Sequence, residues 1–127
     1  MQILTVYGIP NCDSVKKARA WLDGQGMAYA FVDFKKTGVP VDRLLVWAHA
    51  VGWDKLINRR GTTWRKLDAA AQLAADNPQG AQQLALVMPS VIKRPVVQWG
   101  EAVVTVGFDA AQFAETLQKF EPESGNF

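Results

Sequence analysis

The 127-residue sequence contains only one cysteine and one histidine. A single cysteine cannot form a disulfide within the chain, and small secreted domains usually carry an even number of cysteines. One cysteine and one histidine are also too few ligands for a structural zinc site, so we expect no bound metal. This composition favours a reducing compartment, and we expect a cytoplasmic protein.

Long apolar runs are also missing. No stretch of about 18 apolar residues occurs, so we expect no membrane-spanning helix. Residues 1–5 lack the basic and long apolar regions of a signal peptide. The formal net charge of +2 is too small to indicate nucleic-acid binding. We therefore expect no contact with a membrane and no direct contact with nucleic acid.

The overall composition is that of a globular protein, because hydrophobic residues make up 49% and charged residues 20% of the chain. The length fits one domain. No internal repeat, low-complexity tract or linker is present. We expect a domain over residues 1–120 and a polar, frayed tail over residues 121–127.

The first third of the chain has the pattern of a strand, a helix and a second strand. Residues 3–7 and 29–33 are short, apolar and rich in residues that favour strands. Between them, residues 13–23 carry apolar side chains at helical spacing: Val15, Ala18, Trp21 and Leu22. Because the whole unit spans about thirty residues, the two strands should be parallel.

The middle of the chain predicts several helices. Residues 35–40 read as a loop, after which Asp42 is expected to cap a helix that extends to about residue 51. Its inward positions are predicted as Leu44, Leu45, Ala48 and Val51. Further helices are expected to begin at residues 64–67 and to cover residues 79–87 after an Asn-Pro break.

The last third predicts a hairpin and a final helix. Residues 96–99 and 102–106 are strand-like and flank a predicted two-residue turn, Gly100-Glu101. Asp109 is expected to cap a helix that extends to about residue 119. The whole order predicts an α/β protein with a thioredoxin-like fold and a helical insertion between its βαβ and ββα halves.

Cys12 follows the first strand and directly precedes the first helix. Unpaired N–H groups and the helix dipole favour a thiolate at such a position, and the thiolate is the attacking species. Lys16 adds positive charge one turn later, whereas Asp13 opposes it. The alternative is a buried, inert cysteine, which the polar neighbours Asn11 and Ser14 argue against.

Val15 occupies the position at which a thioredoxin-type motif carries its second cysteine. Cys12 therefore lacks an internal partner that could resolve a mixed disulfide. An external thiol must do so, and glutathione is the abundant one in the cytosol.

Two basic segments are candidate anion sites. Arg94-Pro95 lies just before the strand at residues 96–99, and its proline is either a strand-entry residue or a cis proline. Arg94 is either an anion ligand or a surface residue. Arg60 and Arg65 flank a predicted helix start, which is a natural anion site, although a solvated basic turn is the alternative.

Four short segments occur in order along the chain: YGIPNC at 7–12 followed by KKA at 16–18, RGTTWRKL at 60–67, IKRP at 92–95 and VGF at 106–108. Together they resemble the arsenate reductase (ArsC) family, in its YffB-like and Spx-like branch. The resemblance extends to about residue 119. It implies a thioredoxin-like fold with a helical insertion, Cys12 as the nucleophile and a cis proline at Pro95.

The resemblance also implies an anion site. In arsenate reductases of this type three arginines hold the oxyanion, and Arg65 and Arg94 match the first two. The third is expected after the strand at residues 96–99, but residues 100–107 contain no arginine. This departure disfavours arsenate as the substrate.

The expected function is therefore a glutathione-dependent thiol/disulfide reductase with Cys12 as its single nucleophile. No bound cofactor is expected, and glutathione or another small thiol serves as co-substrate. The expected ligands for its anionic groups are Lys16, Arg60, Arg65, Arg94 and the segment at Pro95. The alternatives are a non-catalytic Spx-like regulator that binds RNA polymerase, and an arsenate reductase.

Overall fold

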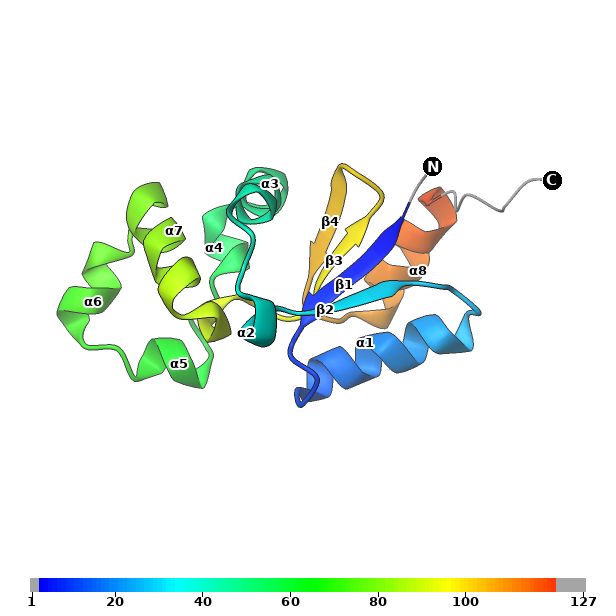
Figure 1. Ribbon diagram of the computed structural model, residues 1–127, viewed down its shortest axis with the longest axis horizontal. Helices are drawn as coiled ribbons and strands as arrows, with labels where there is room; N and C mark the ends of the chain where they lie inside the picture. The colour runs from blue at the N-terminus through cyan, green and yellow to red at the C-terminus, as the bar shows by residue number, and fades with distance from the viewer. Residues whose placement is uncertain (1–2, 121–127) are drawn as a thin grey trace. The chain divides into compact units, whose positions relative to one another are not determined.

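The computed structural model describes residues 3–120 and divides into two compact units (Figure 1). The first unit combines both ends of the chain, up to residue 33 and from residue 94 onward, and the second comprises residues 34–93. The second unit is thus an insertion within the first, as the sequence predicts. The tail expected at residues 121–127 lies outside the described residues.

The first unit is built on a four-stranded sheet. Its strands are β1 (Leu4–Gly8), β2 (Ala30–Asp33), β3 (Val96–Trp99) and β4 (Val103–Val106), in the order β2-β1-β3-β4. β1 pairs with β2 in parallel, and the β1–β3 and β3–β4 pairs are antiparallel. With helices α1 (Asp13–Gly24) and α8 (Ala110–Lys119), this is the predicted thioredoxin-like fold.

Both helices of this unit pack on one core. The core includes buried side chains from β1 and β3, Ala18 and Leu22 from α1, and Phe113 from α8. Phe113 is fully buried and meets the rings of Trp21, Trp99 and Phe108 edge-on, at centroid distances of 5.6, 5.3 and 5.0 Å. α1 and α8 therefore cover the same face of the sheet, because they share this core.

The second unit is helical. It contains α2 (Phe34–Thr37), α3 (Val41–Val51), α4 (Trp53–Leu56), α5 (Thr62–Arg65), α6 (Ala69–Ala74), α7 (Pro78–Val87) and the 3-10 turn η1 (Pro89–Val91). Leu44, Trp47 and Leu56 are fully buried in it. The segment after η1 returns to the end of α4, because Lys93 N donates to the Leu56 carbonyl at 2.8 Å.

A close helix corner joins α6 to α7. Asn77 caps α7, and its Oδ1 accepts a hydrogen bond from Gly80 N at 2.8 Å. A Cβ placed on Gly80 would lie 1.8 Å from the carbonyl oxygen of Ala74, far inside van der Waals contact. Only glycine fits this corner with the backbone in place.

Three predictions in the middle of the chain are wrong. Residues 35–40 are not all loop, because the short helix α2 extends to Thr37. The cap of α3 is Pro40 rather than Asp42, so the helix begins earlier. Leu45 is 47% exposed, whereas Trp47 is fully buried. The inward face of α3 therefore follows the spacing of Leu44 and Trp47, three residues apart.

The hairpin differs from the prediction by one residue. β3 and β4 pair from Trp99 to Val103, so the turn has three residues, 100–102, rather than two. It begins at Gly100, whose φ of 77° is in the region that favours glycine. Ala102 therefore belongs to the turn, and the strand begins at Val103.

Across residues 3–120 every helix is too short or too polar to cross a lipid bilayer. The same residues contain no group of three or more side chains suited to hold a metal ion.

Candidate functional site

Cys12 is the N-cap residue of α1. Its backbone is extended (φ −142°, ψ 126°), and its carbonyl accepts the first helical hydrogen bond from Lys16 N at 2.9 Å. The side chain of Cys12 is partly exposed and does not cap the helix. Its neighbours Asn11, Asp13 and Ser14 are exposed, so the environment differs from that of a buried structural cysteine.

The end of β1 and the start of α1 are in close contact. A Cβ on Gly8 would lie 2.8 Å from Cγ2 of Val15, which is fully buried. Since valine is stiff at χ1, this contact leaves little room for either partner to move. It holds the first turn of α1, and with it Cys12, at the carboxyl end of β1.

Positive charge lies beside the loop that carries the thiol. The ammonium of Lys16 donates to Oδ1 of Asn11, the residue before Cys12, at 3.4 Å. Both residues are exposed, and Asp13 is the one acidic residue in the first turn of α1. The Asn11–Lys16 contact keeps a cation next to the loop that carries Cys12. The sequence predicts the cation but not this contact.

The Arg94–Pro95 peptide bond is cis, as the family resemblance implies. Pro95 is buried, and its carbonyl accepts a hydrogen bond from Gly107 N at 2.9 Å. Val96, the next residue, pairs with Tyr7, which directly precedes Gly8. The register therefore places Arg94-Pro95 at the same end of the sheet as the Cys12 loop.

Arg60 and Arg65 belong to the second unit. Arg60 lies in the turn before α5, where its backbone N donates to Oδ1 of Asn58 at 3.2 Å, and Arg65 is the last residue of α5. Both side chains are exposed.

The neighbouring Arg59 has a different environment. Its guanidinium lies 3.5 Å from both Asp54 and Asp76 and 5.4 Å from the ring centre of Trp64. Arg59 therefore joins α4 to the α6–α7 corner, a structural role that its position in a basic run does not reveal.

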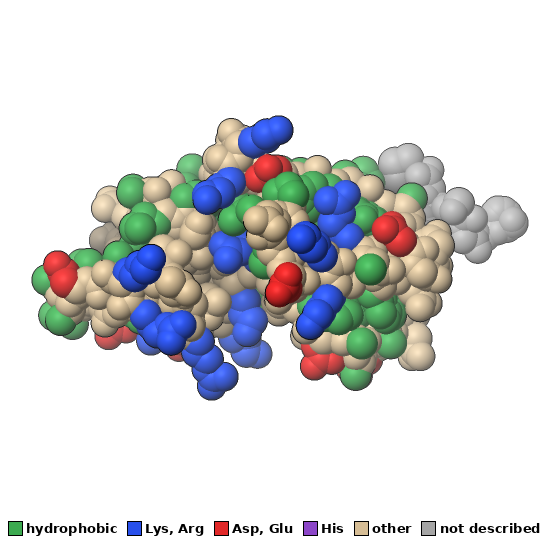
Figure 2. All heavy atoms as spheres, turned by 90° about the horizontal axis from the view of Figure 1, so that it is seen from below, with side chains coloured by type: hydrophobic (Ala, Val, Ile, Leu, Met, Phe, Trp, Pro, Cys, Tyr) green, Lys and Arg blue, Asp and Glu red, His purple; other side chains and the backbone are tan. Residues whose placement is uncertain are grey.

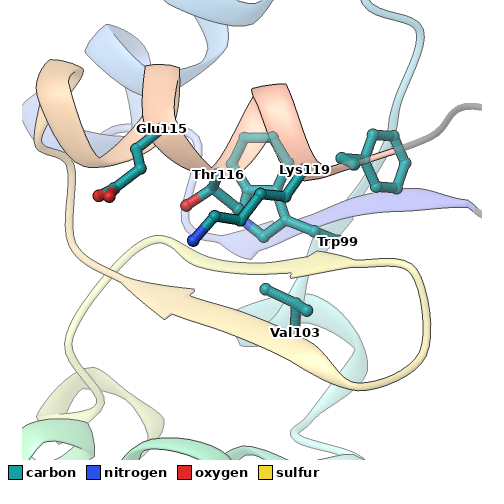
Figure 3. A pocket seen from close by; sticks show the side chains of 6 residues that line it. Trp99, Val103, Glu115, Thr116 and Lys119 are labelled. Carbon is teal, nitrogen blue, oxygen red and sulfur yellow. The ribbon is translucent and has the colours of Figure 1, made fainter.

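A separate cavity of about 330 Å³ lies at the opposite end of the sheet (Figure 3). It is lined by Trp99, Val103, Glu115, Thr116, Lys119 and Phe120. Trp99 pairs with Leu4 at the start of β1, whereas Cys12 follows the end of that strand. This cavity is therefore not part of the Cys12 site.

The sequence profile of the ArsC family matches residues 7–116, from the end of β1 into α8. The chain belongs to the ArsC family. An uncharacterised protein of Haemophilus influenzae is 38% identical over 112 residues, which cover 87% of this chain and 96% of that protein. The similarity to this protein extends along nearly the whole chain.

Two further comparisons indicate the branch within the ArsC family. The solved structure of a YFFB protein has 43% identity and a TM-score of 0.83, and the match covers 90% of this chain and 98% of that one. The global transcriptional regulator Spx of Listeria innocua is 27% identical over 92% of this chain and 88% of its own length. This ArsC-family protein thus lies in the YffB-like and Spx-like branch.

Proposed function

We propose that this ArsC-family protein is a glutathione-dependent thiol/disulfide reductase of the cytoplasm, with Cys12 as its single nucleophile. The observation that carries the proposal is the position of Cys12. Its thiol is partly exposed at the N-cap of α1 and is not used to cap the helix. The thiolate form of an exposed cysteine is the species that attacks a disulfide.

The proposed reaction has two steps. The Cys12 thiolate attacks one sulfur of a substrate disulfide, and the other sulfur leaves as a thiolate that takes a proton from water. The half that remains forms a mixed disulfide with Cys12. A glutathione thiolate then attacks the substrate sulfur of that mixed disulfide. This step releases the Cys12 thiolate and forms a disulfide between glutathione and the substrate half.

An external thiol, which we propose is glutathione, is required because the chain cannot complete the second step alone. The sequence has one cysteine, and Val15 fills the place of a resolving thiol. Val15 is also fully buried against Gly8. The resolving thiol must approach Cys12 from outside.

The basic residues supply the sites for the carboxylates of glutathione. Lys16 is held beside the Cys12 loop, and Arg94-Pro95 lies at the same end of the sheet. Arg60 and Arg65, in the helical unit, remain ligands predicted from the sequence. Arginine binds carboxylates in a two-pronged geometry, and charged hydrogen bonds are about twice as strong as neutral ones.

The second candidate function is that of an Spx-like regulator that binds RNA polymerase without catalysis. It is favoured by the 27% identity to an Spx protein over 92% of this chain. The absence of a second cysteine at position 15 weighs against a disulfide-based sensor. Association with RNA polymerase in a host extract that is unaffected by Cys12→Ser, with no thiol chemistry at Cys12, would favour this second function.

A titration with glutathione, followed by NMR, tests where the co-substrate binds. We expect shifts of backbone amide signals in residues 11–16 and 93–96 at millimolar glutathione. Arg94→Ala should weaken binding by about 1–3 kcal/mol, the cost of losing a charged hydrogen bond. Lys119→Ala, at the exposed end of α8, is the matched control and should leave the affinity unchanged. Shifts confined to other residues, or no binding, would contradict the proposal.

A further inference from the structure

Charge is unevenly divided between the two units. The helical unit, residues 34–93, contains nine Lys or Arg and four Asp, with no Glu. The remaining residues of the chain contain five Lys or Arg and eight Asp or Glu. The small net charge of the whole chain therefore conceals a basic unit and an acidic one.

Each of the four carboxylates of the helical unit already has a partner within that unit. Asp54 and Asp76 both lie 3.5 Å from Arg59, and Asp42 lies 3.7 Å from Arg43. Asp68 caps α6 and accepts a hydrogen bond from Ala71 N at 2.8 Å. None of them is left to neutralise the other cations of the unit.

Five of those other cations lie around η1, and we call this surface the η1 basic face: Lys36, Arg60, Arg65, Lys66 and Lys93. All five are exposed, and none forms an ion pair with a carboxylate within the described residues 3–120. Each has an exposed head group on a long side chain, free to meet a ligand.

The helical packing gathers these cations. Helices α2 and α5, which carry or adjoin Lys36, Arg65 and Lys66, both contact η1. The turn that holds Arg60 is bonded to the same place, because Asn58 N donates to the Val91 carbonyl at 2.7 Å. Lys93 follows η1 by two residues. Figure 2, the view from below that of Figure 1, shows Lys and Arg side chains gathered on this side of the molecule.

We propose that the η1 basic face docks an acidic segment of a partner protein. This inference goes beyond the reductase function, since it concerns a macromolecular partner, although Arg60 and Arg65 are also predicted ligands of glutathione. Exposed cations without local counter-charges steer an oppositely charged partner and fix its orientation.

A nucleic acid fits this face less well. Proteins that bind single-stranded nucleic acid use exposed aromatic rings on which the bases stack. Trp64, which lies between Arg60 and Arg65 in the sequence, is half-buried, and the guanidinium of Arg59 lies over its ring. Binding of a phosphate backbone also depends on the electrostatic field of the whole protein. The other unit carries a net negative charge, which disfavours such binding. An acidic protein segment needs neither stacking nor an extended basic surface.

The test measures binding of the full chain to a fluorescein-labelled peptide of alternating Glu and Ser, by anisotropy at low salt. Lys36→Glu combined with Lys66→Glu should weaken binding by about tenfold or more, since two attractive contacts become repulsive. The control combines Lys17→Glu with Lys119→Glu in the other unit, which changes the net charge equally. We expect it to weaken binding by no more than about twofold.

Three results would overturn the proposal: no binding of the acidic peptide, equal weakening by both double variants, or tighter binding of a single-stranded oligonucleotide of the same charge. Circular dichroism checks that all variants fold. Because Lys36 and Lys66 take no part in the proposed chemistry, Cys12-dependent disulfide reduction should persist in the first double variant. A failure of docking is therefore distinguishable from a failure of the reductase proposal.

Discussion

Gly8 and Val15 are in such close contact that a methyl group on Gly8 would lie 2.8 Å from Cγ2 of Val15. This contact links two properties of the site. It seats the first turn of α1 on the end of β1, which fixes Cys12. It also buries the side chain at position 15, where a dithiol protein would carry its second sulfur.

Gly8→Ala should destabilise the protein by about 1–3 kcal/mol, because the stiff Val15 side chain must move. Adding Val15→Ala should recover part of this loss, since the smaller side chain removes the clash. A double-mutant cycle by urea denaturation measures the coupling. Gly24→Ala is the control, as its Cβ would meet nothing within 4 Å. Additive effects of the two substitutions would show that the contact is unimportant.

Val15→Cys should convert the protein to one that forms an internal disulfide. The N-cap and N3 side chains of a helix lie close together, as capping boxes show. Mild oxidation should therefore remove two hydrogens from the intact mass and leave no free thiol. The wild type should remain a monothiol or join another molecule. A variant that retains two free thiols after oxidation would contradict this geometry.

Gly80→Ala should destabilise the helical unit by about 2 kcal/mol or more, because the added Cβ overlaps the Ala74 carbonyl oxygen and forces the α6–α7 corner apart. Thermal unfolding followed by circular dichroism measures the loss, again with Gly24→Ala as control. An unchanged melting temperature would mean that the corner adjusts freely.

Arsenate should be turned over weakly or not at all with glutathione and glutaredoxin. Removal of one aimed hydrogen-bond donor from an oxyanion site costs about 10²–10³ in rate. No arginine follows Arg94 in this sequence, so the third expected ligand is missing. Arsenate reduction as fast as that of a genuine arsenate reductase would show that another residue supplies this ligand.

The fold could be predicted from the sequence where the pattern is local. Asp109 caps α8 as predicted, with its Oδ1 accepting from Gln112 N at 3.1 Å, because a capping residue acts within its own turn. The inward face of α3 was predicted less well. Leu45 is as apolar as Leu44, and only packing with the rest of the unit determines that Trp47 is buried instead.

The same distinction holds for the site. The order of strand, loop, cysteine and helix predicts Cys12 at the N-cap, and the structure places it there. The role of Arg59 could not be predicted, because its partners Asp54 and Asp76 lie on either side of it, up to 17 residues away. Adjacent arginines in a basic run therefore take separate roles that only the tertiary structure distinguishes.

The measurement that tests the central claim most directly is the reduction of a peptide–glutathione mixed disulfide by wild type and Cys12→Ser, with glutathione as the sole reductant. We expect the wild type to accelerate the reduction, a Cys12–glutathione adduct to appear by mass spectrometry when glutathione is limiting, and Cys12→Ser to show neither. Equal rates for the two proteins and for buffer alone would contradict the claim that Cys12 is a catalytic nucleophile.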